Sequence, residues 1–281
     1  MTGLGNLTRR NSKLFFKDKG MFFTSLITPV ILLVLYATFL AKVYRDSFAS
    51  AVPQGFELDS SLIDATVGGQ LISSLLAVCC ITVAFCSNML MVQDKVTGAL
   101  RDITVTPVKR STLAVSYYIA TVLSTMLICL IATGAGFIYL AKAGWYLSAA
   151  DTALFVLDVI LLVLFGTALS SIINFFLSSQ GQMSAVGTIV SAGYGFICGA
   201  YMPISQFGET LQHVISFLPG TYGTSLLRNH ALAGVYQEMA DTGFPSEVIE
   251  AIKDSVDCNL YFFDSKVETG TMYLILAGST A

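Results

Sequence analysis

The sequence predicts an all-α polytopic membrane protein, a single transmembrane domain over residues 1–281 with six transmembrane helices. Of the 281 residues, 54% are hydrophobic and only 12% are charged, and the mean hydropathy is +0.73. Soluble domains carry roughly 25% charged residues. Long uncharged runs alternate with short polar segments, and a helix that crosses a bilayer needs about 20 apolar residues. Together these observations exclude an ordinary soluble domain.

Six apolar runs are the candidate transmembrane helices. Their approximate ranges are 21–41, 71–92, 113–140, 152–176, 183–202 and 271–281. The last run has only eleven residues, about half of what a bilayer requires. We therefore expect either that the sequence is truncated after Ala281 or that the last span is incomplete, and we favour truncation.

The distribution of charge sets the expected orientation. Residues 1–20 and 93–112 hold nine of the fifteen Lys and Arg residues. Loops rich in these residues stay in the cytoplasm, so the N-terminus and the loop 93–112 are predicted to be cytoplasmic. The long polar segment 203–268, with nine acidic and three basic residues, is then external. The N-terminal residues 1–20 form either an interfacial helix or a plain charged flank.

The cytoplasmic loop has a pattern of its own. A short helix is predicted at about residues 97–104, with Leu100 and Ile103 on one apolar side and Arg101 and Asp102 facing water. Pro107 ends it, because the residue before a proline is disfavoured in the α region. An ordinary cytoplasmic connector remains the alternative on composition alone.

The order of residues in this loop resembles a known family. It reads as an acidic/basic pair, then Thr97-Gly98-x-Leu100, a short helix, and Thr106-Pro107-Val108-x-Arg110. This resembles the loop after the second span in the ABC-2 family of ABC-exporter permeases, where it forms a coupling helix that docks on the ATPase. That family has Glu at the start of the loop, where this chain has Asp94 and Lys95. The segment from Met202-Pro203 to Leu218-Pro219-Gly220 is similar to the family's re-entrant helical hairpin after span 5.

The resemblance implies a permease subunit of an ABC exporter, driven by two copies of a separate ATPase that hold ATP and Mg. A second permease copy or a related permease, and membrane lipid, are the other implied partners; nucleic acid is not. The implied ATPase-coupling residues are Lys13, Lys17, Thr97, Gly98, Leu100, Arg101, Asp102, Ile103, Thr106 and Pro107. The implied cavity or subunit-interface residues, with packing inside one subunit as the alternative, are Ser87, Asn88, Gly187, Ser191, Gly195 and Gly199. The location implied is the cell membrane, and the separate subunits favour a bacterial source.

Chemistry within the chain itself is not expected. The sequence has no Gly-Lys dipeptide and therefore no P-loop, and it has no His-Glu-x-x-His motif. We predict no catalytic residue, no metal site and no cofactor bound by this chain. His213 and His230 lie in the segment predicted to be external and are expected to be surface or interfacial residues rather than ligands. Asp158, the one charge well inside a span, has either a structural or interfacial role, or a role in proton or cation handling.

An ATP-independent secondary carrier or membrane scaffold subunit is the second reading of the chain. Secondary carriers tend to carry intramembrane charges and repeated halves, whereas this sequence has one such acid and no internal repeat. The substrate stays open among drug-like molecules, lipids and lipid-linked molecules.

Overall fold

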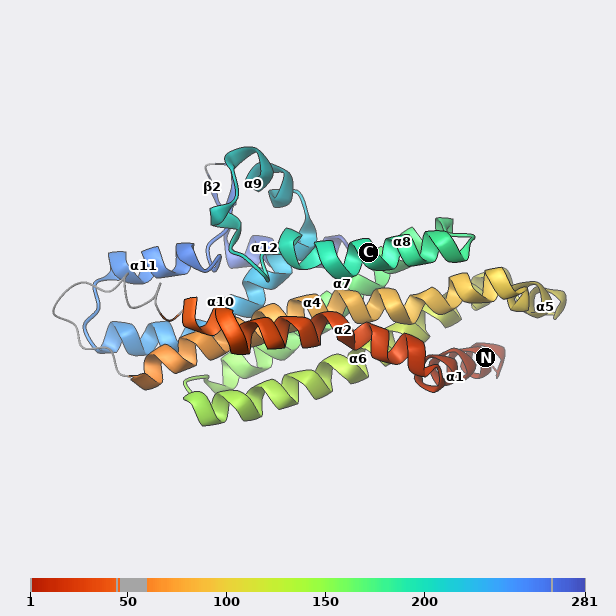
Figure 1. The fold of residues 1–281 in the computed structure, drawn as a ribbon, viewed down its shortest axis with the longest axis horizontal. Coiled ribbons are helices and arrows are strands. Elements are labelled where there is room, and N and C mark those ends of the chain that lie inside the picture. The colour runs from red at the N-terminus through yellow and green to blue at the C-terminus, as the bar shows by residue number, and fades with distance from the viewer. Residues whose placement is uncertain (1, 44, 46–59, 264, 281) are drawn as a thin grey trace.

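The computed structural model describes residues 2–43, 45, 60–263 and 265–280. Long helices run along the longest axis of the molecule, with α1 (Thr2–Lys17) and α5 (Ala99–Val105) together at one end and α11 (Ser246–Ser255) toward the other (Figure 1). We call these the α5 end and the α11 end. The all-α prediction is confirmed, since the strands of the described part of the chain are two residues each.

Four helices in the described residues are long and apolar enough to cross a membrane. The first, Lys19–Val43, begins as α2 (Lys19–Leu35) and continues through a π-helical turn, η1 (Tyr36–Leu40). The other three are α4 (Ser60–Thr97), α6 (Arg110–Ala143) and α7 (Ala149–Phe176). Each contains one of the first four predicted spans.

Helix α4 is the centre of the molecule and packs against α2, α6, α7, α8 and α10. Its 38 residues correspond to a length of about 57 Å at 1.5 Å per residue, well beyond the bilayer core. It begins eleven residues before the predicted span because Leu62 and Ala65 are buried against Leu232 of α10. Tertiary packing thus overrides the polar composition there. Residues 46–59, in the polar segment between the first two predicted spans, lie outside the described residues.

The last two predicted spans correspond to shorter helices. Helix α8 (Gln180–Ile197) has 18 residues and α12 (Thr269–Gly278) has ten. Neither is among the four helices long and apolar enough to cross a membrane. The count of six spans stays a prediction.

The segment predicted to be external is helical and partly enclosed by the bundle. After a 3₁₀ turn, η2 (Ile204–Gln206), its elements are α9 (Glu209–Ser216), α10 (Pro219–Asp241), α11, and the antiparallel pair β1 (Tyr261–Phe262) and β2 (Ser265–Lys266). Helix α10 packs on both α4 and α7. Its close approach to α7 requires glycine, because a Cβ at Gly223 would lie 2.4 Å from Leu162. The break at Leu218-Pro219 separates α9 from α10, and a re-entrant hairpin remains a prediction.

Candidate functional site

The chain turns sharply where α4 meets α5. Gly98, between them, has a φ of 86°, a left-handed conformation that glycine adopts without the steric cost of a side chain. Helix α5 ends at Val105, and Thr106 takes an extended conformation before Pro107. The predicted short helix is therefore present, slightly later in the chain than expected.

The two faces of α5 differ in what they contact. Leu100 and Ile103 are half-buried and pack against a buried cluster formed by Leu90 of α4 and by Leu113 and Tyr117 of α6. These two apolar side chains attach α5 to the protein's own body.

The opposite face of α5 is free within the chain. Val105 is 84% exposed, and Arg101 and Asp102 beside it are also exposed. Lys13 and Lys17 are exposed on nearby α1. The outer face of α5 thus presents the apolar Val105 beside the charged side chains of Arg101 and Asp102.

A partly buried ion pair fastens α1 to the end of α4. Arg10 Nη1 and Nη2 donate to the two carboxylate oxygens of Asp94 at 2.5 and 3.0 Å, and the Tyr117 hydroxyl donates to Asp94 at 2.5 Å. The Asp94 carboxylate raises the pKa of Arg10. Bidentate pairs of this kind are among the stronger protein hydrogen bonds. Sequence reasoning missed Arg10, since nothing in its neighbourhood distinguishes it from the adjacent Arg9.

Lys95 ties α4 to the C-terminal end of α7. Its Nζ donates to the carbonyl oxygens of Asn174, Phe175 and Leu177 at 3.3, 2.6 and 3.2 Å. A lysine here satisfies carbonyls left without helical partners and favours the negative end of the helix dipole. Helices α1, α4 and α7 are therefore joined at the same end that carries α5.

The predicted cavity residues do not share one surface. Gly187 and Ser191 of α8 line a groove of about 580 Å³ with Cys86 and Met89 of α4 and with residues of α2. Ser87 is buried. Asn88 instead turns toward α7 and donates to the hydroxyls of two serines, Ser170 at 3.2 Å and Ser171 at 3.0 Å.

The predicted fifth span carries a ladder of small residues four positions apart, Gly187, Ser191, Gly195 and Gly199, and this ladder also divides. The Tyr201 ring covers Gly195. Gly199 lies beyond the last residue of α8, with a φ of 74°. The ladder is not one helical face, because the helix ends at Ile197 before the fourth member is reached.

Asp158 is buried and joins three helices. Its carboxylate lies 2.6 Å from Nδ1 of His230 on α10 and accepts a 2.5 Å hydrogen bond from the Tyr273 hydroxyl on α12. Asp158 is 0% exposed and His230 is 8% exposed. The expected surface location of His230 is wrong, because α10 brings it into the bundle. These contacts let Asp158 join α7, α10 and α12, and its role in proton or cation handling stays a prediction.

We expect Asp158→Asn to lower the free energy of unfolding by about 1.5–3 kcal/mol, the range for hydrogen bonds to charged groups. Tyr273→Phe, which removes a single hydroxyl from the same cluster, is the matched comparison and is expected to cost less. Thermal unfolding of the purified variants measures both. A wild-type stability for Asp158→Asn would contradict the structural role.

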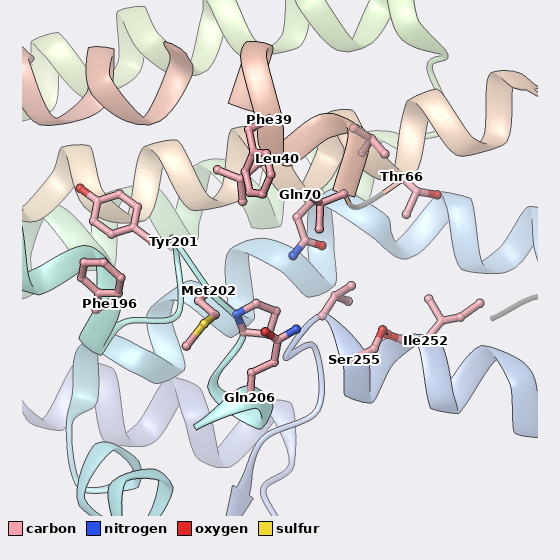
Figure 2. A pocket seen from close by; sticks show the side chains of 14 residues that line it. Phe39, Leu40, Thr66, Gln70, Phe196, Tyr201, Met202, Gln206, Ile252 and Ser255 are labelled. Carbon is pink, nitrogen blue, oxygen red and sulfur yellow. The ribbon is translucent and has the colours of Figure 1, made fainter. Parts of the chain in front are cut away.

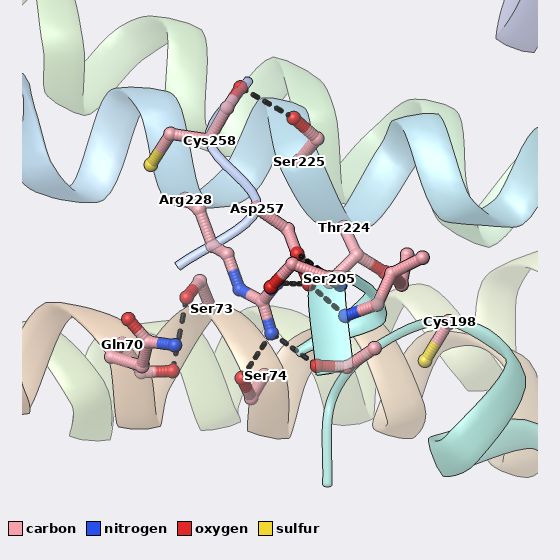
Figure 3. A network of polar contacts seen from close by, with 12 residues as sticks. Gln70, Ser73, Ser74, Cys198, Ser205, Thr224, Ser225, Arg228, Asp257 and Cys258 are labelled. Atoms are coloured by element: carbon pink, nitrogen blue, oxygen red, sulfur yellow. Dashed lines mark hydrogen bonds and ion pairs between the residues drawn. The ribbon is translucent and has the colours of Figure 1, made fainter. Parts of the chain in front are cut away.

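A second buried polar cluster lies toward the α11 end (Figure 3). Arg228 of α10 is 0% exposed; its guanidinium donates to Asp257 at 3.0 Å, to the Ser74 hydroxyl at 3.2 Å, and to the Gly199 carbonyl. Asp257 also accepts from the Ile204 amide at 2.7 Å. Helices α4 and α10, the end of α8 and the loop after α11 meet at this cluster.

The fold and these contacts define a class: an all-helical membrane protein whose short exposed helix is held at one end of a long central helix. The family model for the ABC-2 type transporter matches residues 2–231, and the chain belongs to that family. No curated protein matches the chain. The family's membrane domain is a transmembrane permease domain, which agrees with the four long apolar helices.

Proposed function

We propose that this chain is the membrane-spanning permease subunit of an ABC exporter. It moves a drug-like, lipid or lipid-linked substrate outward, and ATP is hydrolysed with Mg on a separate ATPase subunit present in two copies. A second copy of the chain, or a related permease, completes the pathway. The location proposed is the cell membrane of a bacterium, with the α5 end in the cytoplasm.

The observation that carries this proposal is the exposed face of α5. Val105 is 84% exposed at the tip of a helix that is otherwise attached to the body. Val105 lies close to the charged side chains of Arg101 and Asp102 on one side and to the turn at Pro107 on the other. Such a surface suits a contact with another protein, and the charges select the partner. Leu100 and Ile103 serve as its anchor rather than its contact surface. Thr97, Gly98, Thr106 and Pro107 fix the path of the loop.

The joined helices supply a route for force. The Arg10–Asp94 pair and the Lys95 contacts link α1, α4 and α7 at the α5 end. A push on α5, with Lys13 and Lys17 of α1 as a second contact, moves these three helices as a unit. The groove between α2, α4 and α8 then changes shape against the second permease, and Gly187 and Ser191 lie on the substrate's path.

Purification of the native complex tests the proposal. A tag on this chain is expected to recover an ATPase subunit in equal amount, identified by mass spectrometry together with any bound molecule. In vesicles, the complex is expected to move that molecule outward only with ATP. Recovery without an ATPase, combined with transport driven by an ion gradient alone, would instead identify a secondary carrier.

A further inference from the structure

A cavity of about 400 Å³ lies at the opposite end of α4 from α5 (Figure 2). Its walls come from η1, α4, the loop after α8, and α11. Aromatic and aliphatic side chains, among them Phe39, Phe196, Tyr201 and Met202, make most of the surface. No charged side chain of the described residues lines it.

Gln70 of α4 brings to this cavity a buried amide nitrogen without a partner in the described part of the chain. It is 1% exposed, and its Nε2 has no hydrogen-bond partner among the described residues. Figure 2 shows its amide directed into the cavity, toward the loop that carries Gln206. A buried amide nitrogen without a partner is costly to stability and calls for an explanation. An oxygen atom of a ligand in the cavity would satisfy it.

The backbone beside the cavity is also irregular. Residues Tyr36–Leu40 form a π-helical turn, a rare conformation that is frequent at functional sites. The Tyr36 hydroxyl donates to the Val67 carbonyl of α4 and holds this turn in place. Phe39 and Leu40 of the turn line the same cavity as Gln70 (Figure 2).

We propose that this cavity binds a neutral amphiphile, a lipid-like molecule whose ester, ether or hydroxyl oxygen accepts a hydrogen bond from Gln70 Nε2. The volume falls within the range of about 300–1,000 Å³ for ligand pockets. The apolar walls suit hydrocarbon, and the absence of lining charge disfavours a phosphate or ammonium group. Treating such a ligand as a substrate near its exit rests on the proposed function, whereas binding to the chain does not.

Photolabelling of the purified chain in phosphatidylcholine nanodiscs tests the site. The probe is a diacylglycerol with a diazirine in one acyl chain, and adducts are mapped by mass spectrometry. We expect adducts concentrated on the residues around Phe39, Gln70 and Tyr201. Gln70→Leu should reduce this labelling at least fivefold while raising the melting temperature of the unliganded chain, because it removes the unpartnered amide.

Two further variants make the result specific. Gln93→Leu, the same change near the other end of α4, should leave the labelling unchanged. Ser255→Trp fills the cavity from α11 without altering α4 and should abolish it. A phosphatidylglycerol carrying the same diazirine chain should label the cavity weakly. Equal labelling of wild type and Gln70→Leu, or equal labelling by both lipids, would overturn the proposal.

Adding the ATPase and ATP to the photolabelling experiment distinguishes a transported substrate from a resident bilayer lipid as the ligand in the cavity. Loss of cavity labelling on ATP addition identifies a transported substrate, and unchanged labelling identifies a resident bilayer lipid; both results require the site. The first experiment contains no ATPase. Failure of the site is therefore distinguishable from failure of the permease function.

Discussion

Replacing Arg228 with methionine is expected to lower the free energy of unfolding by about 3–5 kcal/mol, the range for breaking a buried ion pair on one side. The change leaves the carboxylate of Asp257 buried beside two backbone amides and without its cation. Burial already raises the pKa of Asp257, and Arg228 opposes that shift. The Ser74 hydroxyl and the Gly199 carbonyl lose the same donor.

Chemical unfolding of the detergent-solubilised protein measures this loss. Lys266→Met removes an exposed ion pair with Glu250 and should cost no more than about 1 kcal/mol. The double variant Arg228→Met with Asp257→Leu should be more stable than Arg228→Met alone, because no unpaired charge remains. If Arg228→Met lowered the free energy of unfolding by less than about 1 kcal/mol, that result would contradict the stabilising role of the buried Arg228–Asp257 ion pair.

The second large effect is expected at the exposed face of α5. Arg101→Glu combined with Val105→Asp should reduce substrate-dependent ATP hydrolysis by the complex about tenfold or more, equivalent to about 1.4 kcal/mol of coupling. Both side chains are exposed in this chain, so insertion and melting temperature should not change. ATP hydrolysis and transport assayed on the same preparation measure the effect.

Lys109→Glu is the matched control, since it reverses an exposed charge in the same loop beyond Pro107. It should retain most of the coupling. If the double variant and Lys109→Glu behave alike, the effect comes from loop charge in general and not from α5.

Most of what the sequence could predict came from the lengths of its apolar runs. Uninterrupted runs identified the long helices, because a bilayer-length segment without charge has few other uses. The full length of helix α10 could not be recognised in this way. The sequence predicts only a short helix at about residues 221–232, whereas α10 runs over Pro219–Asp241. It packs on α4, α7 and α12, so its residues show no polar face.

The second limit on prediction from the sequence was contact between residues that are far apart in the chain. Arg10 and Asp94 are 84 positions apart, and Asp158 and His230 are 72 apart; no local spacing links such pairs. Periodicity correctly placed Leu100 and Ile103 on one side of the short helix. It could not tell whether that side faced the chain itself or another protein, and the structure places it against buried residues of α4 and α6.

The most direct test of the account is a photo-crosslinking amino acid at Val105 in the native complex. We predict a covalent adduct with the ATPase subunit, and none from the same amino acid at Ile138, which is 65% exposed on α6. An intact complex that yields no ATPase adduct at Val105, or yields one from exposed Tyr261 near the α11 end, would contradict the docking role of α5.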